Sequence, residues 1–138
     1  MIRVFVYGTL KQGYGNYERL LKGSRFVGKA TTRLTYRMNC VGFPFVVPRA
    51  RWLDSPGGAI RDNLAGQVTG EVYEVDAETL VQLDMLEGNG RMYQREEVPL
   101  RMANGQLNWA WMYVWLGRLY SGRPVEPKDG ILEWRRER

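Results

Sequence analysis

The feature that most constrains the fold is a long β-hairpin pattern in the second half of the chain. Residues 93–102 and 106–116 are rich in β-branched and aromatic residues, and they flank Asn104-Gly105, a dipeptide that favours a tight hairpin turn. Four aromatic residues recur at every second position of the second segment, so they share one face of that strand: Trp109, Trp111, Tyr113 and Trp115. We expect that face to be mostly an aromatic core layer, which favours a sheet over a helical bundle.

Further strands and two short helices are predicted along the rest of the chain. Sixteen glycines and eight tyrosines indicate many turns and strands. Residues with strand character occupy 2–7, 25–38, 45–47 and 67–75. A helix is expected over 16–22, and a second over 77–86, where Asp76 can cap the start and Gly88 can end it. The pattern predicts an α+β fold: a mostly antiparallel sheet, curled or closed into a small β-barrel, with short inserted helices.

The 138 residues suit a single domain, 1–138, with one core. Residues 48–66 form a loop-like insertion that serves either as a lid or partner surface or merely as a connection. The tail, residues 121–138, is expected to wrap the outside of the domain or to fray.

Histidine is absent from the chain and cysteine occurs once. These counts exclude Ser-His-Asp and Cys-His nucleophile systems, His-containing metal sites, intramolecular disulfides and thiolate metal clusters. Acid–base chemistry must therefore use Asp, Glu, Tyr or Lys. The apolar start over residues 2–6 is too short for a signal core, and no stretch approaches the roughly 20 apolar residues of a membrane span. We expect a cytoplasmic location.

The net charge of +5 is unevenly distributed. Residues 1–61 carry eleven Lys and Arg against two acidic residues, whereas residues 62–138 carry nine against thirteen. An acidic partner such as RNA is one interpretation. Because the basic residues are dispersed, we favour two halves of one barrel that interleave and neutralise each other, and nucleic acid is an unlikely partner.

The first candidate site is the segment that follows the first strand. Tyr7, Gly8, Thr9 and Leu10 form a glycine-containing turn, which can point backbone N–H groups at an anion. The segment lacks the spacing of a phosphate-binding P-loop. It is either such a cradle or an ordinary turn at the end of a strand.

The second candidate is Glu87, at the C-terminal end of the predicted helix 77–86. The partial negative charge at that helix end disfavours a carboxylate and raises its pKa, so this group could accept and return a proton near neutral pH. A solvated helix-end glutamate is the alternative. Asp84, one helical turn earlier, is expected to face solvent, and Glu71 is expected to pair with Arg95.

Together these segments resemble the γ-glutamyl cyclotransferase-like family, most closely its γ-glutamylamine cyclotransferase branch. The matching motifs occur in order over about residues 3–116: Tyr7-Gly8-Thr9-Leu10, Gly42-Phe43-Pro44, the strand at 70–76, and Leu83-Asp84-Met85-Leu86-Glu87-Gly88 with Tyr93-Gln94-Arg95. Residues 51–65 and the tail do not contribute to the resemblance.

The resemblance implies a small barrel with a cavity at one end, and release of 5-oxoproline from a γ-glutamyl amine or peptide by internal cyclisation. It implies Glu87 as the acid/base and Tyr7, Gly8, Thr9 and Leu10 as the substrate cradle. It also implies substrate-positioning roles for Tyr93 and Tyr113, a small-molecule γ-glutamyl substrate, and neither a metal nor an organic cofactor.

Two alternatives remain open from the sequence. Within enzymes, the substrate could be a γ-glutamyl dipeptide, a γ-glutamyl-lysine isopeptide, glutathione or a γ-glutamylated biosynthetic intermediate. Outside enzymes, the same fold could be a non-catalytic module that binds a small carboxylate or RNA.

Overall fold

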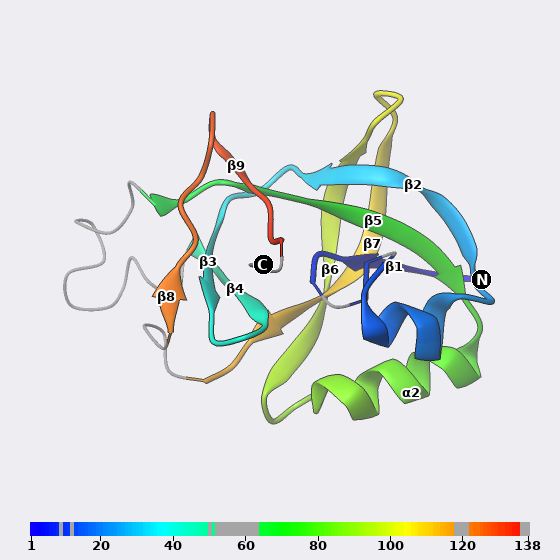
Figure 1. Cartoon of the computed structure of the whole chain (residues 1–138). Coiled ribbons are helices and arrows are strands. Elements are labelled where there is room, and N and C mark those ends of the chain that lie inside the picture. The colour runs from blue at the N-terminus through cyan, green and yellow to red at the C-terminus, as the bar shows by residue number, and fades with distance from the viewer. Residues whose placement is uncertain (9, 12, 50, 52–63, 118–121, 136–138) are drawn as a thin grey trace.

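A closed β-barrel forms the centre of the computed structural model, which describes residues 1–8, 10–11, 13–49, 51, 64–117 and 122–135 (Figure 1). The strands of the barrel are β1 (Ile2–Val6), β2 (Arg25–Thr32), β5 (Gln67–Val75), β6 (Tyr93–Met102) and β7 (Leu107–Trp115). They follow the order β1-β7-β6-β2-β5, and β5 pairs back onto β1 to close the ring. Only the β1–β7 pair is parallel, so the predicted α+β fold with a mostly antiparallel barrel is confirmed.

β1 is buried on both of its faces, which explains its continuous apolar sequence. Phe5 points into the barrel core, whereas Val4 and Val6 belong to a second apolar cluster outside the barrel wall. A strand with two covered faces needs no alternation of polar and apolar residues. β1 pairs with β5 on one side and β7 on the other, so both of its edges are paired within the barrel.

The predicted hairpin is present, with β6 and β7 antiparallel over their whole length. Gly105 has a φ of 88°, a left-handed conformation that suits glycine in such a turn. The expected aromatic core layer is wrong in part, because Trp109 is 56% exposed. The side chains that line the barrel core come from the other face of β7: Ala110, Met112 and Val114. Both faces of this strand carry apolar side chains, so the alternation of side chains along the sequence could not show which face turns inward.

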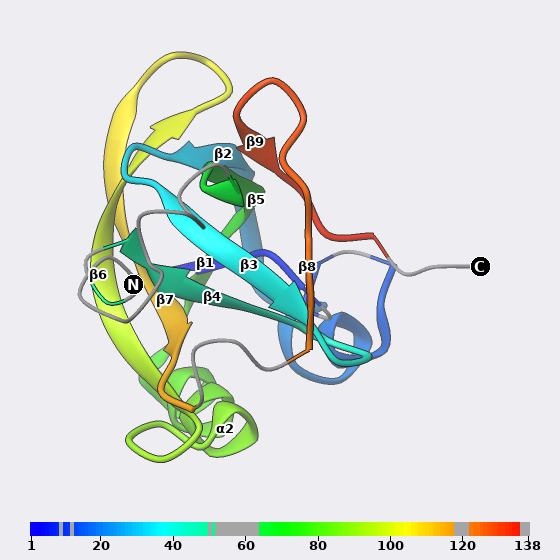
Figure 2. The same cartoon turned by 90° about the vertical axis from the view of Figure 1, so that its left-hand side faces the viewer.

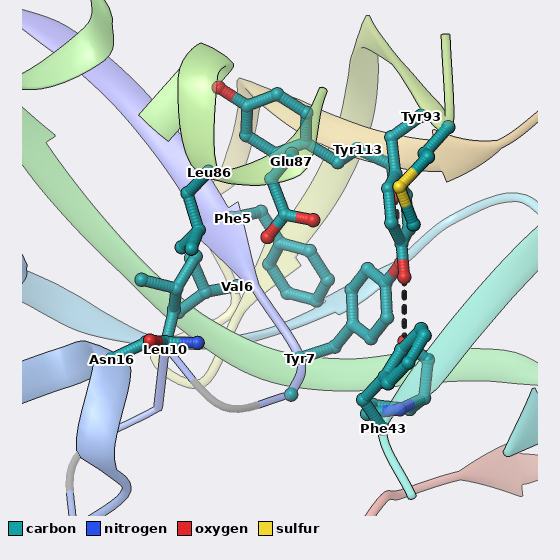
Figure 3. Close-up of a pocket in the computed structure, with 13 residues that line it drawn as sticks. Phe5, Val6, Tyr7, Leu10, Asn16, Phe43, Leu86, Glu87, Tyr93 and Tyr113 are labelled. Carbon is teal, nitrogen blue, oxygen red and sulfur yellow. Dashed lines mark hydrogen bonds between the residues drawn. The ribbon is translucent and has the colours of Figure 1, made fainter. Parts of the chain in front are cut away.

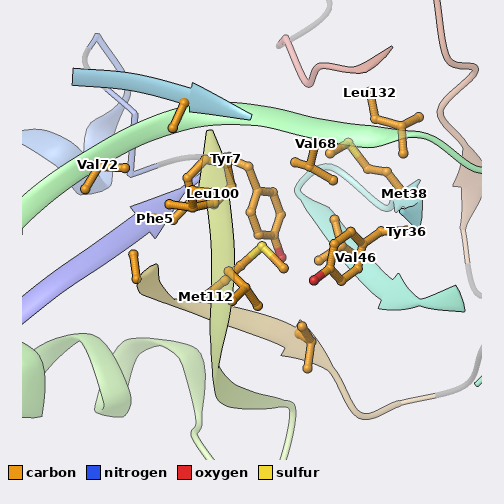
Figure 4. Close-up of a cluster of buried hydrophobic side chains, with 14 of the residues drawn as sticks. Phe5, Tyr7, Tyr36, Met38, Val46, Val68, Val72, Leu100, Met112 and Leu132 are labelled. Atoms are coloured by element: carbon orange, nitrogen blue, oxygen red, sulfur yellow. The ribbon is translucent and has the colours of Figure 1, made fainter. Parts of the chain in front are cut away.

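A smaller sheet packs beside the barrel and extends its core. It contains β4 (Pro44–Pro48), β3 (Tyr36–Cys40) and β8 (Arg123–Pro124), in that order. The core cluster in Figure 4 joins barrel residues such as Leu100 and Met112 to Met38 and Val46 of this sheet.

The described part of the tail, residues 122–135, is part of the fold, so the expectation that it could fray is wrong for that part. β8 pairs with β3, and β9 (Ile131–Leu132) adds to β5 as a parallel strand. Leu132 and Trp134 are buried in the barrel core cluster. Their burial could not be inferred from the sequence because it depends on pairing with distant strands.

Two short helical elements cover the outside of the barrel wall. η1 (Tyr17–Leu21) is a π-helical turn where a short helix was predicted, and α2 (Ala77–Glu87) is an α-helix. Asp76 caps α2, accepting a hydrogen bond of 2.7 Å from the backbone N–H of Thr79, as predicted. Both views place α2 at the end of the barrel opposite the tip of the β6–β7 hairpin (Figures 1 and 2).

Most of the 48–66 insertion, residues 50 and 52–63, lies outside the described residues, so its role stays a prediction. Among the helices that the structure describes, none has the length and apolar character needed to cross a membrane.

Candidate active site

A cavity of about 350 Å³ opens where the end of β1, the last turn of α2 and the start of β6 meet (Figure 3). Every predicted site residue that the structure describes lines this cavity: Tyr7, Gly8, Leu10, Glu87, Tyr93 and Tyr113. Thr9, the remaining predicted residue, lies outside the described residues. The two candidate segments of the sequence, 7–10 and 87, therefore face one another.

Glu87 is the last residue of α2, and its carboxylate points into the cavity (Figure 3). The helix ends there because Gly88 adopts a left-handed conformation, with φ 61° and ψ 52°. Glu87 is half-buried, and burial raises the pKa of its carboxyl from 4.5 to about 7. A carboxyl with that pKa is partly ionised and partly protonated at neutral pH, so it can both accept and donate a proton.

Three tyrosines form fixed walls of the cavity. The Tyr7 hydroxyl donates to the backbone carbonyl of Tyr113 at 2.8 Å, and the Tyr93 hydroxyl donates to the carbonyl of Pro44 at 3.3 Å. The Tyr113 hydroxyl donates to Asp84 Oδ1 at 2.5 Å. Burial raises the pKa of all three phenols, so they stay neutral at physiological pH. Each phenol oxygen still has lone pairs that can accept a hydrogen bond from a ligand.

The turn after β1 comes very close to the smaller sheet. A Cβ atom added to Gly8 would lie 2.7 Å from Cγ of Pro44, nearer than real Cβ contacts come. The backbone N–H of Lys11 donates to the Gly8 carbonyl at 3.0 Å, which closes the turn. Glycine is therefore required at position 8 by the close approach of Pro44, which also lines the cavity.

Several lining residues were not predicted as site residues. Asn16 was expected only to begin a helix, yet its amide lies at the edge of the cavity (Figure 3). Phe43, Leu86 and Met92 add apolar side chains that are half-buried or exposed. The Gly42-Phe43-Pro44 motif was a signal for Phe43, whereas no local pattern distinguishes Asn16 from an ordinary helix start.

Asp84 does not face solvent, so that prediction is wrong. Its carboxylate accepts hydrogen bonds from Arg95 Nε at 3.0 Å and Nη2 at 3.4 Å, besides the one from Tyr113. The expected pair between Glu71 and Arg95 is also wrong. Glu71 accepts a hydrogen bond from Tyr73 at 3.0 Å and lines a different cleft. The partner of Arg95 is set by the position of α2 beside β6, which no local pattern encodes.

The described residues contain no group of three or more His, Cys, Asp or Glu that could hold a metal ion. Glu87 is the only charged side chain among those lining the cavity in the part of the chain that the structure describes. The arrangement can bind a small polar molecule, exclude much of the solvent and exchange one proton with it.

A family model described as γ-glutamyl cyclotransferase, AIG2-like, matches residues 4–136. This match extends through the tail, which the sequence motifs did not support. A protein of Methanocaldococcus jannaschii, provisionally named a γ-glutamylcyclotransferase, is 37% identical over 112 residues, which cover 81% of this chain and 82% of that protein.

The γ-glutamylaminecyclotransferase of Bos taurus is 43% identical over 103 residues, which cover 72% of this chain and 56% of the bovine protein. Among solved structures, the crystal structure of an AIG2-like protein from Mus musculus superposes with a TM-score of 0.65 at 26% identity. That superposition covers 100% of this chain and 98% of the mouse chain. The names of the family and of these relatives indicate γ-glutamyl cyclotransferase activity.

Proposed function

The chain belongs to the AIG2-like γ-glutamyl cyclotransferase family, and on that premise we propose that it releases 5-oxoproline and a free amine from a γ-glutamyl compound. One observation carries the proposal. A single half-buried carboxylate, Glu87, projects into a cavity whose other described lining residues are uncharged. Such isolation keeps the carboxyl close to half-ionised at neutral pH, which is the state that proton transfer in both directions requires.

The reaction begins at the substrate's α-nitrogen. Near neutral pH this nitrogen is an ammonium group and has no lone pair for attack. Glu87 takes one of its protons, and the freed amine attacks the γ-carbonyl carbon, forming the C–N bond of a five-membered ring. The carbonyl electrons move onto oxygen, which gives a tetrahedral intermediate.

The intermediate collapses when the bond from the γ-carbon to the leaving nitrogen breaks. The leaving nitrogen needs a proton to depart as an amine, and the protonated Glu87 returns it. Glu87, now ionised again, takes the second proton of the ring nitrogen and passes it to the departed amine, so the products are the neutral lactam of 5-oxoproline and the protonated amine. A single carboxyl serves both steps, which is consistent with a chain that has no histidine.

The rest of the cavity orients the substrate for ring closure. Because attack is intramolecular, holding the glutamyl part in the closing conformation contributes several kcal/mol to the rate. The backbone of the turn from Tyr7 through Leu10 would hold the α-carboxylate, and the Asn16 amide, which lines the same cavity, would assist. The Tyr7 and Tyr93 oxygens, on the other side of Glu87 in Figure 3, would accept hydrogen bonds from the α-ammonium group.

The leaving amine would occupy the outer part of the cavity, between Phe43, Leu86 and Met92. Leu86 is 37% exposed and Met92 is 48% exposed, so these side chains border the opening. A leaving group with its own carboxylate would bring a second negative charge near Glu87, and the described lining residues include no cation to offset that charge. An amine with an uncharged, apolar substituent therefore fits better than a dipeptide or glutathione.

The experiment is an assay of 5-oxoproline release by the purified protein. The panel contains γ-glutamylbutylamine, γ-glutamyl-ε-lysine, γ-glutamylalanine and glutathione, each tested with wild type and Glu87→Gln. We expect turnover to be fastest with the butylamide and lost in the variant. Equal turnover of the alanine and butyl compounds would contradict the preference for an apolar amine. Binding without release of 5-oxoproline by any member would favour the non-catalytic small-ligand module instead.

RNA binding is the second alternative, and it requires a different readout. The basic residues of the first half do not line the Glu87 cavity among the described residues. A salt-sensitive gel shift with RNA that persists in Glu87→Gln would favour that alternative.

A further inference from the structure

Behind one wall of the cavity lies a cluster of three residues, Asp84, Arg95 and Tyr113, which we call the Asp84 clamp. One carboxylate oxygen, Asp84 Oδ1, accepts both the Tyr113 hydroxyl at 2.5 Å and Arg95 Nε at 3.0 Å. The side chains of Arg95 and Asp84 are only 21% and 24% exposed, so water screens their interaction weakly. Arg95 also lies over the ring of Trp111, with its guanidinium carbon 4.5 Å from the ring centroid.

The clamp ties the end of α2 to the β6–β7 hairpin at several points. The backbone carbonyl of Asp84 accepts the N–H of Asn89 at 2.9 Å, and the Asn89 side chain accepts the backbone N–H of Arg95 at 2.9 Å. The backbone carbonyl of Tyr113 accepts the hydroxyl of Tyr7, which brings the turn after β1 into the same network. Glu87 is three residues beyond Asp84, so a helix end held at Asp84 also sets the direction of Glu87.

The Asp84 clamp also determines how much charge lies near Glu87. Asp84 lies one helical turn from Glu87, and a lone carboxylate there would oppose ionisation of Glu87. Arg95 carries the opposite charge directly on Asp84, so the pair presents little net charge to the cavity.

The other elements around Glu87 present no competing charge within the described part of the chain. The turn after β1 presents the neutral phenol of Tyr7, and β6 and β7 present those of Tyr93 and Tyr113. β4 presents Pro44, and η1 is preceded at the cavity edge by the amide of Asn16. Glu18 of η1 and Lys22, the residue after η1, have exposed side chains and pair with each other at 3.3 Å.

We propose that Asp84 is a positioning residue of this site, which holds the Tyr113 wall and the last turn of α2 in place while Arg95 neutralises its charge. The effect of Asp84 on catalysis rests on the function proposed above for Glu87. The effect of Asp84 on the ionisation of Glu87 does not rest on that function, and it can be measured without any substrate.

The test compares two variants, Asp84→Asn and Arg95→Gln. The first removes the negative charge of the clamp and the second removes its positive charge, and both replace the side chain by an uncharged one of similar shape. Asp84→Asn keeps an acceptor for Tyr113 but removes the negative charge, so the pKa of Glu87 should fall. Arg95→Gln exposes the Asp84 charge, so the pKa of Glu87 should rise. Charges about one helical turn apart in a partly buried setting predict shifts of about 0.5–1 unit in each direction. Arg95→Lys keeps the charge and serves as the matched control, with the pKa of Glu87 unchanged.

The readout is the carboxyl ¹³C titration of Glu87 by NMR, with the signal assigned by its loss in Glu87→Gln. Shifts of opposite sign support the proposal, because a general loss of structure cannot move one pKa in two directions. Shifts of the same sign, or none, in folded variants overturn it.

Tyr113→Phe tests the positional part separately, because it removes one hydrogen bond without changing charge. We expect the pKa of Glu87 to stay constant and kcat to fall about tenfold at unchanged KM. An unchanged kcat would overturn this part. If Glu87 titrates as expected but no variant and no wild type releases 5-oxoproline, the clamp stands and the proposed function fails.

Discussion

The Glu87 cavity and a second cleft of about 260 Å³ share one loop but differ in how their charges are arranged. Tyr7, Gly8 and Leu10 line the cavity, whereas Lys11, the next residue along, lines the cleft. The cleft contains three cations and two carboxylates among its described lining residues: Lys11, Lys29, Arg135, Glu71 and Glu133. The cavity contains one charged side chain among its described lining residues.

In the cleft, charged groups are close enough to stabilise one another. Arg135 Nη2 lies 2.6 Å from Glu133 Oε1, and Glu71 accepts a hydrogen bond from Tyr73. Burial lowers the pKa of Lys11, while Glu133 and Glu71 favour its charged form. In the cavity, burial acts on Glu87 without a cation among the described lining residues to oppose it, and its pKa rises to about 7. A buried carboxylate therefore becomes a candidate acid/base through its isolation, and not through burial alone.

The largest expected difference between the two regions is in activity. Glu87→Gln should lower kcat/KM for 5-oxoproline release about 10²–10⁴-fold, because the amide can neither accept nor return the proton. Glu71→Gln, the matched change in the cleft, should alter kcat/KM less than about threefold, since Glu71 lines the cleft and not the cavity in which the proton is exchanged. If Glu71→Gln loses as much activity as Glu87→Gln, the assignment of the acid/base role to Glu87 is contradicted.

The dependence of rate on pH should report the isolated carboxyl directly. Glu87 must be ionised to act as a base, so kcat/KM should rise with pH up to about 7 and fall again at higher pH, where the substrate's own ammonium group loses its proton to the solvent. Two units below that pKa only about 1% of the carboxyl is ionised, so the rate at pH 5 should be about 100-fold below its maximum. A rate that is constant from pH 5 to 7 would show that Glu87 is not the titrating group.

The stability of the fold should show the cost of isolating a carboxylate. The pKa of Glu87 is higher in the folded state, at about 7, than its ordinary 4.5, so folding favours the protonated form. The penalty for ionisation is absent below about pH 4.5, grows between 4.5 and 7, and is complete above 7.

Glu87→Gln cannot ionise, so it should be more stable than wild type by about 1–3 kcal/mol at pH 8 and nearly equal at pH 4. Urea unfolding followed by tryptophan fluorescence at both pH values measures the difference. Glu71→Gln removes the charge but keeps an amide oxygen that can accept from Tyr73, so it should change the free energy of unfolding by about 1 kcal/mol or less, without a gain at pH 8. A gain in both variants would remove the distinction between the two regions.

The smallest expected effect concerns the shared loop. Gly8→Ala places a Cβ atom against the Pro44 ring, and we expect a loss of about 1–2 kcal/mol in stability together with a raised KM. Gly15→Ala is the control, because no atom lies within 4 Å of its added Cβ and its backbone needs no left-handed conformation. Thermal unfolding and Michaelis kinetics of both variants separate a local clash from a general effect of losing glycine.

Local chemistry explains which parts of the fold could be predicted from the sequence. β5 and α2 begin and end close to the predicted residues, since an N-cap at Asp76 and a left-handed glycine at 88 act within one turn of the chain. The hairpin follows from Asn104-Gly105 in the same way. The family resemblance, and not any local pattern, linked Glu87 to the loop after β1, and both line the same cavity.

The features that the sequence did not reveal depend on contacts between segments that are distant in the sequence. The partner of Arg95 is fixed by the packing of α2 on β6, and the burial of Trp134 depends on the tail reaching the loop after β1, where Lys11 Nζ donates to the Trp134 carbonyl at 2.6 Å. The choice of the inner face of β7 depends on the closure of the whole barrel. None of these is specified within a window of a few residues.

The pairing of β1 with two strands from later in the chain has a consequence for synthesis on the ribosome. β1 is made well ahead of its partners β5 and β7, which come from residues 67–75 and 107–115. Its apolar residues Val4, Phe5 and Val6 stay exposed until those partners emerge, which is a period of risk for aggregation. The cavity is completed only when most of the chain has been translated, so nascent chains that end before β7 carry Glu87 but no site around it.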